Sequence, residues 1–210
     1  MDYRQIPAIF LADAPGLDFL NSVATPVDEE VDWISDGEGL LAWLEQAELV
    51  PGAALEEIRI RSTAAELDDV AARARDLREW FRGFVRKRKG RPLVAKDLRE
   101  IEPLNQLLER DQQHGEIVTN TSGGVTSFEL RANRRWQSAA SLLMPIAEAL
   151  ARLVCEEDFR YVKACEGPRC TLMFADHTRG HGRRWCSMAM CGNRAKVAAH
   201  RKRLKERAGG

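Results

Sequence analysis

Four of the five cysteines in the chain lie between residues 165 and 191, and their spacing constrains the fold more than any other feature. Cys165 and Cys170 form one C-x4-C pair, fifteen residues follow, and Cys186 and Cys191 form a second such pair. Structural Zn²⁺ sites favour four thiolates in a tetrahedron, commonly supplied as two close pairs separated by a longer excursion. We therefore predict one structural Zn²⁺ held by these four cysteines. Free buried cysteines or a redox pair explain the double spacing less well, because redox motifs use a two-residue gap.

Helical geometry decides how each pair can reach one ion. Residues five apart on a regular α-helix point about 140° away from each other, so each pair must include a turn. Gly167 and Pro168 supply that turn in the first pair. The second pair is expected to lead into a helix, with either Ser187 or Asn193 as its N-cap.

The residues around the cysteines predict a small module. Residues 159–164 and 171–175 are expected to form two short strands that flank the first pair, and a helix follows the second pair. This order is typical of a treble-clef-like zinc module, which buries too little apolar surface to be stable without its metal. Four thiolates leave no open position for a catalytic water. A histidine in place of one cysteine is the alternative ligand set, and the candidates are His177, His181 and His200.

Charge is divided unevenly along the chain, although the net charge is zero. From Cys165 to the end, eleven Lys and Arg residues face three acids, a balance of +8, which leaves −8 on the remainder. Clustered positive charge attracts the phosphate backbone of nucleic acids. The alternative is that the acidic body neutralises the basic end, within one molecule or across a dimer.

Residues 193–207 form an Ala-rich, strongly basic run that predicts a helix held at one end by the zinc module. Such a helix can lie in a DNA groove, and Asn and Arg suit adenine and guanine. A solvated helix that only improves solubility is the alternative. The predicted DNA-binding residues are Arg183, Arg184, Asn193, Arg194, Lys196, Arg201, Lys202, Arg203 and Lys205.

The rest of the sequence is mainly helical. Hydrophobic periodicity predicts helices within 13–23, 40–47, 54–89, 96–109 and 136–155. Two β-prone runs around the turn residues 121–124 predict a β-hairpin over 116–131. Pro103 and Pro145 are expected to bend or restart their helices. The cationic run 86–89 is expected to end the helix that precedes it. Cys155 is expected to be a buried thiol. The predicted fold is mainly α with a small β-hairpin: a helical N-terminal domain over 1–158 and a C-terminal treble-clef-like zinc module over 159–210.

Composition excludes several classes. With 210 residues, 44% hydrophobic and 30% charged, the chain can form a core, and it contains no run near the roughly 18 apolar residues of a membrane helix. The N-terminus carries an early acid and its apolar run ends at Asp13, so we expect a cytoplasmic protein that does not associate with membranes. Because it has neither a glycine-rich phosphate loop nor a Ser/His/Asp cluster, we expect no enzymatic activity.

Two groups of motifs resemble known bacterial families. Trp185-Cys-Ser-Met188 followed by Cys191-Gly-Asn-Arg194 resembles the signature of the CGNR zinc finger, and Cys165-x4-Cys170 and Phe174-x-Asp176 agree with it. Leu17-Asp-Phe-Leu-Asn-Ser22 and Leu40-Leu-Ala-Trp-Leu44 resemble motifs of the ABATE domain that usually precedes this finger. The resemblance covers essentially the whole chain. It implies a stress-responsive transcription regulator with zinc on Cys165, Cys170, Cys186 and Cys191.

These observations lead to two functional hypotheses. In the first, the N-terminal domain senses a small-molecule effector or mediates assembly while the zinc module binds DNA, as a homodimer if the site is two-fold. In the second, the protein is a zinc-stabilised ligand-binding or protein-interaction protein without direct DNA binding. The polar residues Asp18, Asn21 and Ser22 are candidates for a pocket, although capping a helix explains them equally well.

Overall fold

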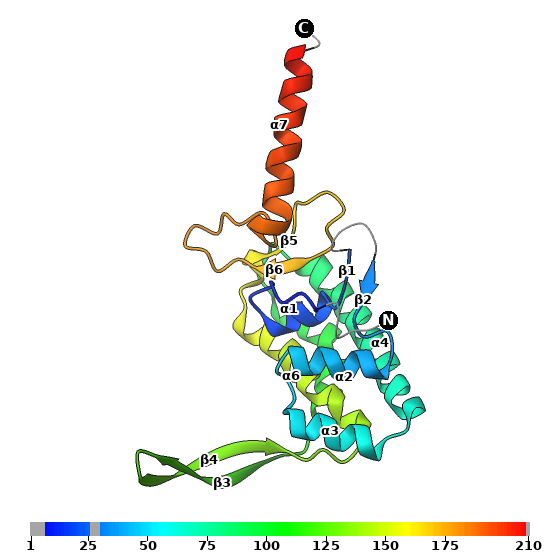
Figure 1. The fold of residues 1–210 in the computed structure, drawn as a ribbon, viewed down its shortest axis with the longest axis vertical. Helices are drawn as coiled ribbons and strands as arrows, with labels where there is room; N and C mark the ends of the chain where they lie inside the picture. Colours follow the sequence, from blue (N-terminus) through cyan, green and yellow to red (C-terminus); the bar gives the residue numbers. More distant parts are fainter. Residues whose placement is uncertain (1–6, 26–29, 209–210) are drawn as a thin grey trace.

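The protein is described here by a computed structural model that covers residues 7–25 and 30–208 (Figure 1). Two helices, α4 (Ala64–Arg88) and α6 (Leu143–Glu156), form the frame of the body. The short helix α1 (Pro15–Leu20) packs against both of them, α2 (Gly37–Gln46) packs on α4, and α3 (Gly52–Arg61) packs on α2. None of the helices in the described ranges is both long enough and apolar enough to cross a bilayer.

One hydrophobic core joins these helices to the cysteine-rich end of the chain. Its largest fully buried side chains include Trp33, Trp43, Phe19 and Phe81 from the body. The core continues into the C-terminal part through Phe159, Leu172 and Phe174, and the rings of Phe84 and Phe159 meet edge to face at 6.1 Å. The predicted boundary between residues 158 and 159 therefore lies where the packing is continuous, and it stays a prediction.

The helix predicted over 54–89 is wrong as a single element. Ser62 and Thr63 interrupt it between α3 and α4. The Thr63 hydroxyl accepts a hydrogen bond from the Glu66 backbone N–H at 3.3 Å, and the Glu66 carboxylate accepts one from the Thr63 N–H at 2.8 Å. This capping box starts a new helix, because it satisfies donors that the first turn leaves without partners.

Both prolines restart their helices as expected. A 3₁₀ helix, η1 (Ala95–Ile101), precedes α5 (Glu102–Leu108), which has Pro103 in its first turn. Another, η2 (Ala139–Leu142), leads into α6, where Pro145 lies in the first turn. Cys155 does not have the predicted burial: it is exposed, because the buried face of α6 is formed by residues such as Ile146 and Leu150.

Several cations in the body are buried, which helical periodicity does not indicate. Arg88 belongs to the cationic run at the end of α4, yet it is 3% exposed and pairs with Asp97 at 3.0 Å. Arg78 is equally buried and makes a two-pronged contact with Asp32 at 2.7 and 2.8 Å. These pairs fix α4 to its neighbours, since breaking one would leave an uncompensated buried charge.

The predicted hairpin is confirmed and is longer than expected. Strands β3 (Gln113–Ser122) and β4 (Val125–Arg134) pair antiparallel along their whole length. They project from the body as an arm (Figure 1). A smaller antiparallel pair, β1 (Val23–Ala24) and β2 (Val31–Asp32), lies beside α4.

The C-terminal part has the predicted order of elements. A 3₁₀ turn, η3 (Phe159–Tyr161), precedes strand β5 (Val162–Ala164), which pairs with β6 (Met173–Ala175). A π-helical turn, η4 (Met188–Gly192), leads into α7 (Asn193–Ala208), which points away from the body (Figure 1). The fold is therefore mainly α with small antiparallel hairpins, and the predicted fold class is confirmed.

Two sets of contacts hold β6 to the body. The Asn21 side-chain amide donates to the Met173 carbonyl at 2.8 Å, and its oxygen accepts from the Met173 N–H at 3.0 Å. The Ala175 N–H donates to the Ala12 carbonyl at 2.8 Å. Asn21 thus joins the two parts of the chain through its side chain. It is also the C-cap of α1, where its backbone N–H donates to the Leu17 carbonyl at 2.9 Å, in line with the capping alternative.

Candidate metal centre

The four predicted thiols converge on one point. The sulfur atoms of Cys165, Cys170, Cys186 and Cys191 all lie within 4.8 Å of one another. The Cys170 and Cys186 sulfurs are 3.9 Å apart, and those of Cys186 and Cys191 are 3.6 Å apart. In a tetrahedron with Zn–S bonds of about 2.3 Å, the sulfurs are separated by about 3.8 Å. The donor set and its spacing therefore fit one structural Zn²⁺.

The first pair is held by a tight turn between β5 and β6. The Cys165 N–H donates to the Leu172 carbonyl at 2.9 Å, and the Cys170 N–H donates to the Gly167 carbonyl at 3.0 Å. A Cβ at Gly167 would lie 2.9 Å from the Cys191 sulfur and 3.2 Å from the Cys170 Cβ. Gly167 is needed here because no side chain fits between the two halves of the cluster.

The second pair is held by the start of a helix. Ser187 is the N-cap: its hydroxyl accepts hydrogen bonds from the Ala189 and Met190 N–H groups at 3.1 and 3.4 Å. The structure thus decides between the two N-caps that the sequence left open. Cys191 follows Cys186 by five residues, and the π-helical turn brings its side chain to the same side of the backbone as that of Cys186. A regular α-helix would turn the two side chains away from each other.

Clustering shifts the pKa values of the thiols in opposite directions. The hydrogen bond from Cys186 lowers the pKa of Cys170 to about 5, whereas burial raises the pKa of Cys165. The pKa of Cys186 is raised strongly, first by its hydrogen bond to Cys170 and then by burial. Because cysteine binds a metal as the thiolate, Zn²⁺ binding here would release the protons that these thiols hold.

Donors around the cluster compensate the negative charge of thiolates. The backbone N–H groups of Gly167 and Cys186 point at the Cys165 sulfur at 3.4 and 3.2 Å. The Arg194 guanidinium donates to the Cys191 sulfur at 3.3 Å and to the Met190 carbonyl at 2.7 Å. Arg194 therefore ties the first turn of α7 to the centre, in the way that outer-shell partners orient metal ligands.

The histidines considered as alternative ligands lie elsewhere. His177 pairs with Glu157 at 2.7 Å, and His181 stacks on Tyr161 with ring centroids 3.4 Å apart. His200 is an exposed residue of α7. Within the described residues, the cluster that could hold a metal consists of cysteines alone.

Asp176 organises the loop between the two cysteine pairs. It is completely buried, and it accepts hydrogen bonds from Lys163 Nζ at 2.7 Å, the Thr178 hydroxyl at 2.6 Å and the Arg183 N–H at 2.9 Å. Burial alone would raise the pKa of Asp176, but these donors outweigh it and hold the pKa far below its usual range. The loop is thus closed around an ionised carboxylate.

Arg183, predicted to contact DNA, is instead directed into the protein. Its guanidinium lies 4.2 Å from the Phe174 ring centroid and donates to the carbonyls of Leu11 at 2.8 Å and Trp185 at 3.0 Å. It also bonds the Cys186 carbonyl and pairs with Asp13. Arg183 thus clamps the N-terminal segment to the zinc module.

The other predicted DNA-binding residues lie on or near the surface around α7. Arg184 is 64% exposed, stacks on Trp185 and pairs with Glu166. Asn193, Arg194, Lys196 and Arg201 are exposed on α7. For Lys202, Arg203 and Lys205, the structure describes the backbone position on α7 but not the side chain.

Comparison with family models agrees with this geometry. A model named ABATE and described as "Putative stress-induced transcription regulator" matches residues 13–157, and the CGNR zinc finger matches residues 161–204. The chain belongs to the ABATE family. The family resemblance of both parts is therefore confirmed. The first description names a transcription regulator and the second a zinc finger. A search of curated protein sequences finds no significant match.

Sequence reasoning missed the groups that support this ABATE chain's metal centre. Arg183 is indistinguishable in sequence from Arg184, and only the packing of residues 11–13 against the module separates their roles. Lys163 and Asp176 lie thirteen residues apart, and strand pairing brings them together. Gly167 was noted for its turn, but its proximity to Cys191 depends on the fold.

Proposed function

We propose that this ABATE protein is a cytoplasmic transcription regulator that binds DNA, with the zinc module holding α7 in a fixed direction. The observation that carries the proposal is the combination of a basic helix projecting from the body (Figure 1) and a four-cysteine cluster at its base. A helix whose described side chains beyond its first turn are exposed, and which carries a strong single-sign charge, is suited to a polyanionic partner.

The surface of α7 supports this role. Its sixteen residues carry seven Lys and Arg and one acid, and span about 24 Å at about 1.5 Å per residue. Apart from Ala195, every side chain of α7 that the structure describes is exposed, and Val197 and Leu204 are about half exposed. This apolar stripe is too narrow to pack the helix against the body, while a helix of about 10–12 Å diameter matches the width of the major groove.

The base of α7 adds further contacts. A hollow of about 750 Å³ is lined by Trp185 and Met188, with Arg184 and Lys196 at its sides. We propose that these two cations bind phosphates and that Asn193 contacts base edges. Arg194 can join this contact through Nη1, because its Nε and Nη2 donate to Met190 and Cys191 within the protein. Arg201, Lys202, Arg203 and Lys205 extend the same contact along the helix. Arg183 is left out of this interface, because its donors are used within the protein.

For the N-terminal domain we propose a sensing role. A cavity of about 410 Å³ lies between α1 and α6, lined by Pro15, Leu49, Pro145 and Leu153 with charged groups such as Arg152 at its edge. That volume is in the range of small-molecule sites. Native mass spectrometry of the protein purified from its host tests the role, and repeated preparations without a bound small molecule would count against it.

The DNA-binding proposal is tested by fluorescence anisotropy with sheared genomic DNA at about 50 mM and about 200 mM salt. One variant replaces Arg201, Lys202, Arg203 and Lys205 of α7 with Gln. The matched control replaces four exposed cations of the body with Gln and so changes the net charge equally: Arg86, Lys87, Lys89 and Lys96.

We expect the zinc-loaded protein to bind DNA with an affinity that falls steeply with salt. The α7 variant should lose at least tenfold in affinity and up to about four units of the salt slope, since each phosphate contact contributes about 0.9. The body variant should remain within about threefold of the unmodified protein. If the zinc-loaded protein does not bind at low salt, the DNA-binding proposal is refuted and the alternative of a ligand-binding or protein-interaction protein is favoured.

A further inference from the structure

The β3–β4 arm has two chemically different faces. Paired residues share a face and successive residues alternate, so the register sorts the arm's side chains into two sets. One set, here called the apolar face, has no charged residue along its outer part: Gly115, Ile117, Thr119 and Thr121 from β3, and Thr126, Phe128, Leu130 and Ala132 from β4. At the base of the arm the Gln113–Arg134 pair continues the same set, and Arg134 is ion-paired there with Asp111 and Glu148. The opposite set, the polar face, includes Glu116, Glu129 and Arg131.

The apolar face is exposed although its composition is that of a buried sheet. Phe128 is 76% exposed, Leu130 75% and Ile117 73%. Alternation of this kind is typical of a sheet with one face packed against a core, and an exposed contiguous apolar patch of a few hundred Å² is often a functional surface. A two-stranded hairpin is also only marginally stable without packing on one face.

We propose that the apolar face is a dimerisation surface, which packs antiparallel on the same face of a second copy of this chain. The register makes the face complementary to itself. When two arms stack about a two-fold axis through the Ile117–Leu130 pair, the Thr119–Phe128 pair of one arm opposes the Gly115–Ala132 pair of the other. The large Phe128 ring therefore faces the two smallest residues, which is how facing layers interdigitate.

Charge and shape at the base of the arm favour the same partner. The outer part of the apolar face carries no formal charge, and Arg134 at its base is 10% exposed and paired with Asp111 and Glu148. Two copies therefore meet without repulsion, and an anionic partner such as DNA gains little there. A hollow of about 260 Å³ lies at the base of the arm, lined by the apolar residues Leu49, Pro51, Ala132 and Trp136 and by the polar residues Gln113, Asn133, Arg134 and Glu148. In the antiparallel arrangement, the tip of the partner's arm lies over this hollow.

The available area sets the expected strength. Each strand is about 34 Å long and the pair is about 10 Å wide, so stacking buries about 340 Å² per copy. Stable interfaces bury about 800 Å² per partner, and the tip contact supplies only part of the difference. We therefore expect a reversible dimer with a dissociation constant in the range of about 1–100 μM.

Sedimentation velocity without DNA, from about 1 μM to about 200 μM protein, tests this proposal independently of DNA binding. The test variant combines Phe128→Thr and Leu130→Thr, which remove apolar area but keep residues that favour strands. The control is Val125→Thr, because Val125 is 71% exposed on the same arm but belongs to the polar face. Circular dichroism and zinc content confirm that each variant folds.

We expect the unmodified protein to shift from monomer to dimer across this range. The double variant should weaken the dimer at least tenfold, and the control should stay within twofold. A protein that remains monomeric at every concentration would overturn the proposal. So would a dimer that the double variant leaves unchanged, or one that Val125→Thr weakens equally.

Discussion

Replacing Arg183 with Lys separates the geometry of this residue from its charge. The guanidinium bonds the carbonyls of Leu11, Trp185 and Cys186 at once, and its side chain is 19% exposed. A lysine ammonium at the end of a flexible stem cannot reach three acceptors in one plane, so two partly buried carbonyls lose their partner. At about 1–2 kcal/mol for each charge-assisted bond in this partly exposed site, we expect a loss of about 2–4 kcal/mol in the free energy of unfolding.

The measurement is urea denaturation followed by circular dichroism at a fixed free Zn²⁺ concentration, since binding of metal shifts apparent stability. The matched control is Arg184→Lys. Arg184 and its partner Glu166 are 64% and 50% exposed, and an ion pair of this kind contributes about 0–1 kcal/mol. Both variants keep the net charge, so neither should change DNA affinity by more than about twofold through long-range electrostatics.

The opposite result would refute the structural role. If Arg183→Lys changes the free energy of unfolding by less than about 0.5 kcal/mol while DNA affinity falls tenfold, Arg183 acts as the sequence predicted. Its side chain would then be turned toward the ligand in solution. A loss of stability with unchanged DNA affinity would confirm the clamp.

Three further results follow from the site and the body. Removing Zn²⁺ with a chelator should release one ion per chain and lower the Tm by at least about 5 °C in calorimetry; unchanged melting would contradict a structural metal. Gly167→Ala should weaken Zn²⁺ binding about tenfold or more in competition with a chromophoric chelator, because its Cβ would lie 2.9 Å from the Cys191 sulfur. Burial raises the pKa of Asp18 from 3.8 to about 6, so the native state keeps a proton that the unfolded chain releases. The free energy of unfolding should therefore decrease by up to about 3 kcal/mol as the pH rises from about 4 to about 6. Asp18→Asn should abolish this decrease, as measured by urea denaturation at several pH values.

The cysteine cluster was predictable because its information is local. The two C-x4-C pairs, the turn residues between them and the strand-prone segments around them all lie within a short stretch. The capping box at Thr63 and Glu66 was equally local, and its T-x-x-E pattern marks the break that hydrophobic periodicity alone overlooks. Periodicity continues across Ser62 because α3 and α4 both face the same core.

The remaining differences depend on tertiary contacts. Arg78 and Arg88 are buried because Asp32 and Asp97 reach them from other elements, and no spacing rule indicates such pairs. The β-prone runs and the turn residues between them predicted the hairpin correctly, but the alternation of side chains along its strands normally implies a covered face. That the apolar face lies open could be learned only from the position of the arm outside the body (Figure 1).

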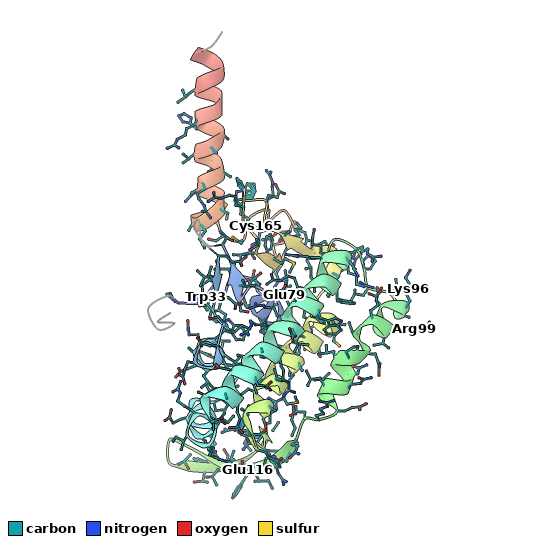
Figure 2. All side chains as sticks on the ribbon, turned by 90° about the vertical axis from the view of Figure 1, so that its right-hand side faces the viewer. Trp33, Glu79, Lys96, Arg99, Glu116 and Cys165 are labelled. Atoms are coloured by element: carbon teal, nitrogen blue, oxygen red, sulfur yellow. The ribbon has the colours of Figure 1, made fainter. Side chains whose placement is uncertain are left out.

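The placement of the arm makes DNA binding and dimerisation separable. Figure 2 shows Cys165 at the base of α7 and Glu116 on the arm, at opposite ends of the body. In helix-turn-helix dimers, the interface places two recognition helices about 34 Å apart on one side of the DNA. Dimers joined through these arms would instead carry α7 at their far ends, and would bridge two separate DNA segments. We therefore expect the Phe128→Thr, Leu130→Thr variant to bind a short duplex with unchanged affinity in anisotropy, yet fail to link two differently labelled duplexes in a pull-down. Equal loss of both activities would show that the arm and α7 act at a single DNA site.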